Sequence, residues 1–443
     1  MPTHLSLTAA WAEQLLELDP LAAPGVENAA RLGLTDYLAC ALGGAIDPAL
    51  DKVVQALPAS TGEATVIGRG VAVDPLAAAL LNGYSGHALD YDDVHRSVRG
   101  HPGTVLLPAL LALAQTRQLS GQRLLAAYAV GVEAMGRLGL AVGGGHYEAG
   151  FHNTATLGTI ASAIACGWLI ELSAPSLSIA IGLAATQASG LRLQFGSEAK
   201  PLHAGLAARN GLSSALLAEA GLGGAAESLA GEGGFLEVYG FGQAVPERLL
   251  APHDAWQIVT PGLIFKRYAS CAATHHAADA ALQLHAERGP DAPDIERITV
   301  TFPPGLTTPL ATRLPDDRAG GRFSVEYVVA HASLNGHLQA GAFDKGGIDP
   351  AVRRLMENVK VVVDADAPSI TQPPFARFSV VELLDVRGGR RTVRADAPRP
   401  GDPHEKLLAA AGNPARGQDL LAVVAALHDA QSLQQLMTTL SRP

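Results

Sequence analysis

Residues 90–114 read DYDDVHRSVRGHPGTVLLPALLALA, and they place a run of titratable side chains directly before a long apolar segment. The first twelve residues hold three aspartates and two histidines, whereas the rest has the Ala and Leu content of a buried helix. Burying charge beside an apolar core is costly, so such a stretch is either a solvated loop or a site with shifted pKa values. His101 stands just before the helix start, where free amides and the helix dipole favour an anion. The stretch therefore indicates a site for a small acidic ligand.

A helical pattern extends outward from this stretch over residues 7–250, with apolar residues three and four apart and breaks at Gly, Pro or Asn. Beyond it, residues 295–302 (IERITVTF) and 375–396 (FARFSVVELLDVRGGRRTVRAD) alternate apolar and polar side chains, and the second carries a Gly-Gly turn typical of a hairpin. The last forty residues return to a helical pattern. We predict a mainly α protein, with a large all-helical domain (1–260 and 405–443) and a smaller inserted α+β lid domain (261–404).

Composition limits the classes of function. The chain has 443 residues, more than one hydrophobic core usually serves, and 48% hydrophobic against 17% charged residues, so we expect surface buried in a homodimer. The net charge of −10, without a run of Lys or Arg, argues against nucleic acid and acidic membranes as partners. The first sixteen residues lack the pattern of a signal peptide, and no uncharged apolar run reaches membrane-spanning length, so we expect a cytoplasmic protein.

The sequence also gives no sign of a metal site or cofactor. Its three cysteines, Cys40, Cys166 and Cys271, are widely spaced, which predicts neither a disulfide framework nor structural zinc. A phosphate-binding loop, a GxGxxG turn and an HExxH motif are all missing from the sequence. We expect catalysis, if any, to depend on side chains alone.

Several apolar helices are each preceded by a titratable residue. His101 and His152 stand before the segments 102–114 and 153–169, Lys200 and His203 open a third helix, and His275 follows Thr274, an expected N-cap, at the start of a fourth. If these helix starts converge, they form a pocket of amides, imidazoles and one ammonium group. Such a pocket suits a substrate with two or three carboxylates.

Five motifs occur in the order found in one family of enzymes. They are HALDYDDVHRSVRGHPG (87–103), GFHNTATLGT (150–159), GSEAKPLHAGLAARNG (196–211), FKRYASCAATHHAADA (265–280) and FSVEYVVA (323–330). Over nearly its whole length the chain resembles the MmgE/PrpD family, which includes 2-methylcitrate dehydratase, cis-aconitate decarboxylase and iminodisuccinate epimerase. The resemblance implies a dimer with a helical body and an α+β lid, and a reaction next to a carboxylate or imine without metal or organic cofactor.

The resemblance also assigns residues. Six positions match residue types that line the pocket of the decarboxylase: Asp90, His101, His152, Lys200, His275 and Tyr327. We expect His101 and His152 to act as general acid and base, with Asp90 orienting or tuning one of them. Lys200 is expected to hold a substrate carboxylate, while His275 and Tyr327 complete the pocket from the lid.

Other residues near these motifs carry weaker expectations. Arg192, His203 and Lys266 are further candidates for contact with substrate carboxylates. Asp92, Asp93 and His95 either solvate the turn or belong to the site, and the sequence leaves both alternatives open.

The sequence departs from the family pattern at three places that bear on substrate choice. The loop from Asp90 to His101 is one residue longer, Val94 stands where a threonine would fall, and Asn153 replaces a proline. A dehydratase of the 2-methylcitrate type is slightly favoured on general frequency. The alternatives are an iminodisuccinate-type epimerase, a cis-aconitate-type decarboxylase or, in another class, a non-catalytic binding member of the fold.

Overall fold

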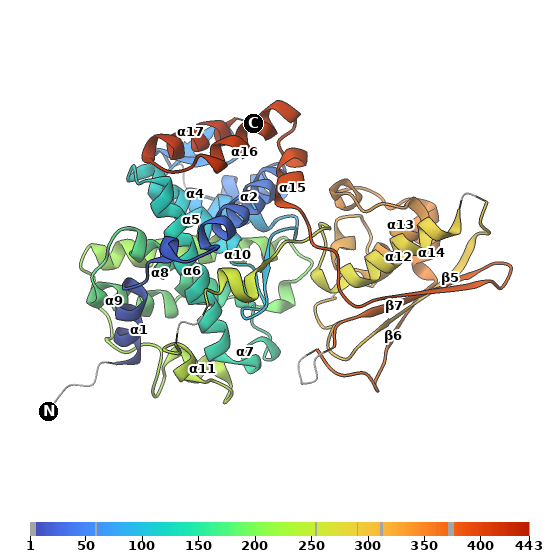
Figure 1. The fold of residues 1–443 in the computed structure, drawn as a ribbon, viewed down its shortest axis with the longest axis horizontal. Helices are drawn as coiled ribbons and strands as arrows, with labels where there is room; N and C mark the ends of the chain where they lie inside the picture. The colour runs from blue at the N-terminus through green and yellow to red at the C-terminus, as the bar shows by residue number, and fades with distance from the viewer. Residues whose placement is uncertain are drawn as a thin grey trace. The chain divides into compact units, whose positions relative to one another are not determined.

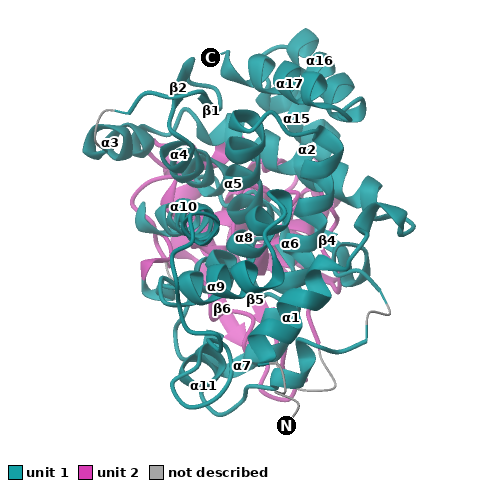
Figure 2. Ribbon diagram, turned by 90° about the vertical axis from the view of Figure 1, so that its left-hand side faces the viewer, with its two compact units in different colours: residues 1–193, 198–265, 402–443 teal, residues 194–197, 266–401 magenta. Residues whose placement is uncertain are grey.

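The computed structural model describes residues 6–57, 60–252, 255–289, 291–310, 313–370 and 376–442. The chain divides into two compact units, drawn in two colours in Figure 2: unit 1 contains residues 1–193, 198–265 and 402–443, and unit 2 contains 194–197 and 266–401. The mainly α architecture with a smaller α+β part is confirmed. The domain ranges expected from sequence differ from these units by a few residues at each boundary and by the short segment 194–197.

Unit 1 is built mainly of α-helices. They are α1 (Leu7–Leu16), α2 (Val26–Gly44), α3 (Pro48–Ala56), α4 (Pro75–His87), α5 (Gly103–Thr116), α6 (Gly121–Val142), α7 (Gly144–Glu148), α8 (Asn153–Leu169), α9 (Ala174–Ala185), α10 (Ala199–Glu219), α11 (Phe235–Gly240), α15 (Pro403–Ala410), α16 (Pro414–Ala425) and α17 (Ala430–Ser441). Figure 2 shows α5, α6, α8 and α10 in the middle of this unit, with the other helices around them.

The central helices are apolar on every side because they are covered on every side. Each residue of α5 from Gly103 to Ala114 is buried, and so is nearly all of α8. By length and composition α6 could cross a membrane, yet 89% of its apolar window is buried inside the protein, as in the core helix of a globular unit. The titratable helix starts of unit 1 therefore emerge from a well-packed apolar core.

A crossing of two glycines brings α4 and α10 into close contact. A Cβ atom added to Gly83 would lie 2.8 Å from the Cα of Gly205, and one added to Gly205 would lie 2.3 Å from the carbonyl oxygen of Leu80. Only glycine permits this approach. As a result, the end of α4 at His87 lies near the start of α10, which carries Lys200.

The expectation of an all-helical domain holds for most of unit 1, but this unit also contains two small antiparallel sheets. The strands β1 (Ala64–Val66) and β2 (Val71–Val73) form one sheet, and β3 (Val94–His95) pairs with β4 (Leu263–Ile264) in the other. Strands of two or three residues are too short to show an alternating pattern in a sequence. The second sheet holds the loop that carries the aspartates and histidines.

Unit 2 combines a four-stranded sheet with three helices, and Figure 1 shows the helices gathered on one face of the sheet. The strand order is β6-β5-β7-β8, with β5 parallel to β6 and antiparallel to β7. Its elements are α12 (His275–Arg288), β5 (Ile295–Phe302), α13 (Val325–Asn335), α14 (Pro350–Glu357), β6 (Val359–Val363), β7 (Ser379–Asp385) and β8 (Arg390–Ala395).

Two local expectations for unit 2 have different outcomes. The hairpin β7–β8 does turn at the glycine pair, where Gly388 has a φ of +83° that favours glycine. Thr274, in contrast, does not cap α12, because its hydroxyl donates to the carbonyl oxygen of Cys271 at 2.8 Å instead of accepting from the helix amides. A short 3-10 turn, Ala272–Thr274, leads into the helix and takes the place of a side-chain cap.

Candidate active site

The loop between α4 and α5, residues 88–102, buries its aspartates, although Arg96 in the same loop is exposed. Asp92 and Asp93 are 0% and 2% exposed, and His95 is fully buried. His95 donates from Nε2 to the carbonyl oxygen of Gln257 at 2.9 Å and also lies in the β3–β4 pair. The solvated-loop alternative for these three residues is therefore wrong. His95 nevertheless has a structural place, because its Nε2 binds a backbone carbonyl and its backbone belongs to the β3–β4 pair.

Asn153, one of the departures from the family pattern, ties this loop to α8. Its side-chain amide donates to the carbonyl oxygen of Val98 at 2.7 Å, and both residues are buried. A proline at this position has no such donor. The extra loop residue and the asparagine thus belong to the same local arrangement.

Backbone geometry fixes the protonation of His101. Its Nδ1 atom lies 2.7 Å from the carbonyl oxygen of Asp93. Because a carbonyl oxygen only accepts hydrogen bonds, Nδ1 carries the proton and Nε2 carries the lone pair of the neutral ring. Asp92 Oδ2 lies 3.4 Å from the same Nδ1 and can stabilise the ring once it is protonated. This is the tautomer that a general base acting through Nε2 requires.

Asp92 also holds a second imidazole. Its Oδ2 lies 2.8 Å from Nδ1 of His87, the last residue of α4, and both side chains are buried. The rings of His87 and His101 have centroids 4.7 Å apart. Burial, together with the nearby Lys200 ammonium, lowers the pKa of His87, while Asp92 opposes this shift. One buried carboxylate therefore faces two imidazoles.

Asp93 has a different role from Asp92. Its Oδ1 accepts the amide hydrogen of Gly103 at 3.0 Å, at the first turn of α5. Burial raises the pKa of Asp93 well above its ordinary value, and the neighbouring carboxylates of Asp36 and Asp92 add to the shift. The site thus contains one carboxyl group that favours its neutral form beside one that binds two imidazoles.

His152 and His203 form a second imidazole pair. His152 precedes α8 and its Nδ1 lies 3.2 Å from Nδ1 of His203, so that one ring donates to the other. The His152 ring stacks on His87 with centroids 5.8 Å apart and an interplanar angle of 23°. Burial lowers the pKa of His152 well below its ordinary value, and the Lys200 ammonium lowers it further. His152 is thereby kept neutral near pH 7.

Lys200 and Asp90 form a buried ion pair. Lys200 Nζ lies 2.5 Å from Asp90 Oδ1, and their side chains are 6% and 5% exposed. Asp90 adopts a φ of +49°, in the left-handed region that a residue with a side chain rarely enters. Asp90 thus contacts Lys200, and its carboxylate also favours the protonated form of His87; its expected role in orienting or tuning His101 or His152 stays a prediction. A substrate carboxylate at Lys200 would take over part of this pairing.

Arg192 lies beside the segment that carries His152. Its amide donates to the carbonyl oxygen of Gly150 at 2.8 Å, and its guanidinium carbon lies 4.1 Å from the ring centroid of Tyr147. The guanidinium carbon of Arg99 lies 4.1 Å from the same centroid. Two cations therefore stack on one aromatic ring, and neither forms an ion pair within the described part of the chain.

The three candidates in unit 2 are each buried. His275 begins α12 and donates from Nε2 to the carbonyl oxygen of Ser270 at 3.2 Å, which leaves Nδ1 as the acceptor. The hydroxyl of Tyr327 donates to the carbonyl oxygen of Ala342. Lys266 is 3% exposed. Their expected contacts with a substrate stay predictions.

Unit 1 therefore brings together five of the expected residues: Asp90, His101, His152, Lys200 and His203.

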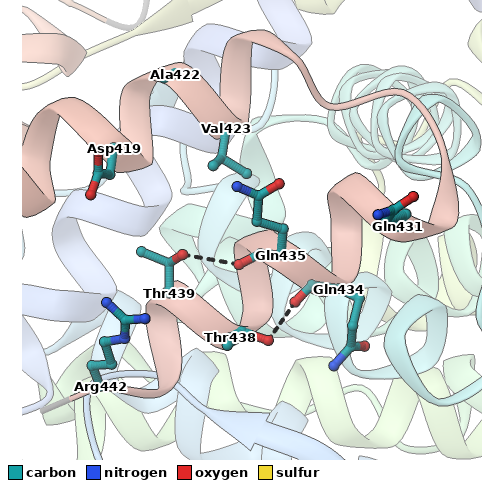
Figure 3. A pocket seen from close by; sticks show the side chains of 9 residues that line it. All are labelled: Asp419, Ala422, Val423, Gln431, Gln434, Gln435, Thr438, Thr439 and Arg442. Carbon is teal, nitrogen blue, oxygen red and sulfur yellow. Dashed lines mark hydrogen bonds between the residues drawn. The ribbon is translucent and has the colours of Figure 1, made fainter.

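A separate groove of about 640 Å³ lies between α16 and α17, and Figure 3 shows the amide and hydroxyl side chains that line it. Two of its hydroxyls, on Thr438 and Thr439, donate to backbone oxygens of their own helix. Because the described lining contains no imidazole, lysine or thiol, proton chemistry belongs to the histidine cluster and not to this groove.

Donor atoms of His87, Asp92 and His101 all lie within 4.8 Å of one another, which is the spacing of a possible metal site. In this arrangement, however, the Nδ1 atoms of both rings face oxygen atoms and carry protons. A metal ion bound through either Nδ1 would have to displace that proton, and at His101 also the contact with Asp93.

Models of two protein domains match this chain: the MmgE/PrpD N-terminal domain over residues 8–247 and the MmgE/PrpD C-terminal domain over residues 268–410. The chain belongs to the MmgE/PrpD family. It is 34% identical over 281 residues to a cis-aconitate decarboxylase of Aspergillus terreus, which covers 60% of this chain and 56% of that protein. It is 31% identical over 390 residues to a cis-aconitate decarboxylase-like protein of Aspergillus oryzae, covering 81% and 80%. It is 30% identical over 308 residues to the cis-aconitate decarboxylase of Homo sapiens, covering 67% and 63%.

His87 is not among the site residues predicted from the sequence, although it is the first residue of the first MmgE/PrpD motif. Its position at the end of an apolar helix is typical of a structural histidine. The sequence signal that could have identified His87 is its spacing, because it stands five residues before Asp92 at the end of α4. Only the structure shows that the chain turns there and brings the Asp92 carboxylate against the His87 ring.

A second buried ion pair, which was not predicted from the sequence, binds the backbone of the loop 88–102. Lys406 on α15 lies 2.5 Å from Asp36 Oδ1 on α2, and its Nζ donates to the carbonyl oxygen of Tyr91 at 2.7 Å. Burial lowers the pKa of Lys406, but Asp36 outweighs it and the net pKa is raised. Helix α15 thus holds the loop backbone between Asp90 and Asp92.

Proposed function

We propose that this protein is a lyase that removes one carboxylate, as CO2, from a small unsaturated tricarboxylate of the cis-aconitate type. The observation that carries the proposal is the cluster in unit 1, where His101 offers a lone pair at Nε2 beside the Lys200 ammonium and two further imidazoles. Such a cluster binds several carboxylates and exchanges protons near neutral pH. The decarboxylases named above, which are similar to this chain, support this reaction over the dehydration slightly favoured by sequence.

The chemistry requires charge stabilisation and one proton. When the bond to the departing carboxylate breaks, its electron pair stays on the carbon framework and spreads towards a neighbouring carboxylate. Lys200 can stabilise that charge by leaving Asp90 for the substrate, because both contacts are ion pairs in a buried setting. A protonated imidazole then supplies one hydrogen to a carbon of this framework, which balances the loss of CO2.

Dehydration and epimerisation need the same cluster but differ in products. Incubation of the purified protein with cis-aconitate, 2-methylcitrate and iminodisuccinate in D2O, followed by NMR, separates them. We expect CO2 and one deuteron in the product from cis-aconitate. Loss of water from 2-methylcitrate, or deuterium exchange between stereoisomers of iminodisuccinate, would assign one of the other reactions. Binding of all three acids without any turnover would indicate a non-catalytic member.

Two further properties are part of this proposal. We propose a homodimer, because the composition combines many hydrophobic residues with few charged ones. We also propose that the protein works in the cytoplasm with a free polycarboxylate as its substrate. Sedimentation analysis and cell fractionation test these two points.

A further inference from the structure

We propose that His87 is a further catalytic residue of this site, which donates a proton to the substrate from Nε2 while Asp92 holds its Nδ1. The inference rests on the proposed function, since it names the source of the proton that decarboxylation consumes. Nδ1 of His87 lies 2.8 Å and 3.0 Å from the two carboxylate oxygens of Asp92. Its Nε2 is buried and has no hydrogen-bond partner in the part of the chain that the structure describes.

An unpartnered nitrogen in such a place indicates a missing ligand. Buried polar atoms are nearly always hydrogen-bonded, and those that are not require an explanation. His87 is 1% exposed, and its ring lies between those of His101 and His152, at centroid distances of 4.7 Å and 5.8 Å. A substrate group that enters between these imidazoles would meet Nε2. The same atom would then be in position for proton transfer.

His146 is a buried histidine with a different pattern of bonds. His146, also fully buried, donates from Nδ1 to the carbonyl oxygen of Tyr239 at 3.0 Å and contacts Thr156 Oγ1 through Nε2 at 2.7 Å. Both of its nitrogens are satisfied by the protein. His87 satisfies only the nitrogen that faces a carboxylate, which is the arrangement used to hold a catalytic imidazole.

The proton balance follows from the groups around the ring. Asp92 and Asp90 favour the protonated ring, burial and Lys200 favour the neutral one, and the neighbouring imidazoles are those of His101 and His152. Binding of a tricarboxylate adds negative charge beside His87 and draws Lys200 towards the substrate. Both changes favour uptake of one proton by the ring as the complex forms.

The step itself is balanced. The carbon–carbon bond to the departing carboxylate breaks and CO2 leaves, while the electron pair remains on the carbon framework. A carbon of this framework takes the hydrogen of Nε2, and the ring becomes neutral while the other hydrogen stays on Nδ1, where it is hydrogen-bonded to Asp92. The next proton enters from solvent through His101, whose side chain is 12% exposed and faces the same carboxylate.

His87→Asn tests the proposal because the asparagine amide can still donate to Asp92 in place of Nδ1, whereas Nε2 is removed. Calorimetry with tricarballylate, a saturated tricarboxylate, in two buffers of different ionisation enthalpy measures protons taken up on binding. We expect about one proton for the wild type and none for His87→Asn, and kcat with cis-aconitate lowered roughly 10²-fold or more with a smaller change in KM. Wild-type kcat and proton uptake in His87→Asn would overturn the proposal.

His95→Gln is the matched control, because His95 also has a buried nitrogen, Nδ1, without a hydrogen-bond partner in the described chain, but its other nitrogen is bonded to the Gln257 carbonyl and not to a carboxylate. The glutamine keeps a donor for that carbonyl. We expect it to retain kcat and proton uptake; loss of both in this control as well as in His87→Asn would overturn the assignment to His87. If His87→Asn does not fold, nitrogen NMR of histidine in the wild type gives the answer. Protonation of His87 Nε2 on binding tricarballylate supports the proposal, and an unchanged neutral ring refutes it. A wild type that takes up the proton at His87 but releases no CO2 refutes the proposed reaction and not the site.

Discussion

Lys200 Nζ lies 2.5 Å from Asp90 Oδ1, and the two buried side chains are separated by 110 residues in the chain. The pair joins the first turn of α10 to the loop that follows α4. In a buried setting, removal of one partner leaves the other charge uncompensated, which typically costs about 3–5 kcal/mol. The pair therefore links α10 to this loop, and its ammonium group is the cation that we propose for binding a substrate carboxylate.

We predict that Lys200→Met lowers the free energy of unfolding by about 3–5 kcal/mol and abolishes measurable binding of tricarballylate. The double variant Asp90→Asn/Lys200→Met should recover most of the stability, because no charge is left unpaired, but not the binding. Urea unfolding and calorimetry on the two variants measure these quantities. Equal stability of Lys200→Met and the wild type would show that the pair contributes little.

We predict that His101→Ala lowers kcat by roughly two to four orders of magnitude, because it removes the partly exposed imidazole through which protons enter the site. The circular dichroism spectrum should not change, since the side chain is partly exposed. The measurement is CO2 release under saturating substrate. Near-normal turnover in this variant would remove His101 from proton transfer.

Asp92→Asn should move the pH dependence of kcat. The Asp92 carboxylate raises the pKa of His87 against the effect of burial, so its loss lowers that pKa further. An acid must be protonated to act, and activity is lost as pH rises through its pKa. The alkaline limb of the profile therefore shifts to lower pH in Asp92→Asn, together with a lower maximum. An unshifted limb with only a lower maximum would indicate a purely structural role for this carboxylate.

His146 makes stability depend on pH. Burial lowers its pKa to about 4, against about 6.5 for an unperturbed histidine. The unfolded chain thus binds more protons between these two values, and the free energy of unfolding falls as pH decreases through this window. At pH 4 this difference in proton binding lowers the free energy of unfolding by roughly 3 kcal/mol relative to neutral pH. In urea unfolding between pH 7 and 4, His146→Gln should lose less stability than the wild type; an identical loss would refute this origin.

The two guanidinium groups on Tyr147 should attract the substrate. Arg192→Gln and Arg99→Gln are each predicted to raise KM for the tricarboxylate several-fold at low salt, with a small effect on kcat, because they lie beside the histidine segments without an ion pair in the described chain. The control is Arg117→Gln, whose residue already pairs with Glu219 on the surface. If all three variants have the same KM, the arginines stack on Tyr147 for structural reasons only.

The sequence predicted those features that depend on short-range patterns. The helical body, the hairpin at Gly388 and the positions of His101, His152 and Lys200 at helix starts all follow from periodicity and from residues that precede apolar segments. In each case the information lies within about twenty residues.

The remaining features depend on contacts that no local pattern encodes. Lys406 and Asp36 are 370 residues apart, and the inward fold of the loop needs a two-residue strand at Val94 to pair with one at Leu263. His87 was missed because an apolar helix end is an ordinary place for a structural histidine. Its function becomes visible only with the bond to Asp92 and the unpartnered Nε2.

The most direct measurement is carbon NMR of the wild-type protein with uniformly ¹³C-labelled cis-aconitate in D2O. We predict a ¹³C signal from CO2 and bicarbonate that grows in step with a product carrying one deuteron, and a rate at least 100-fold lower in His101→Ala. Labelled cis-aconitate that stays unchanged in the presence of folded protein, or a product that keeps all of its carboxylates, would contradict decarboxylation at the histidine cluster.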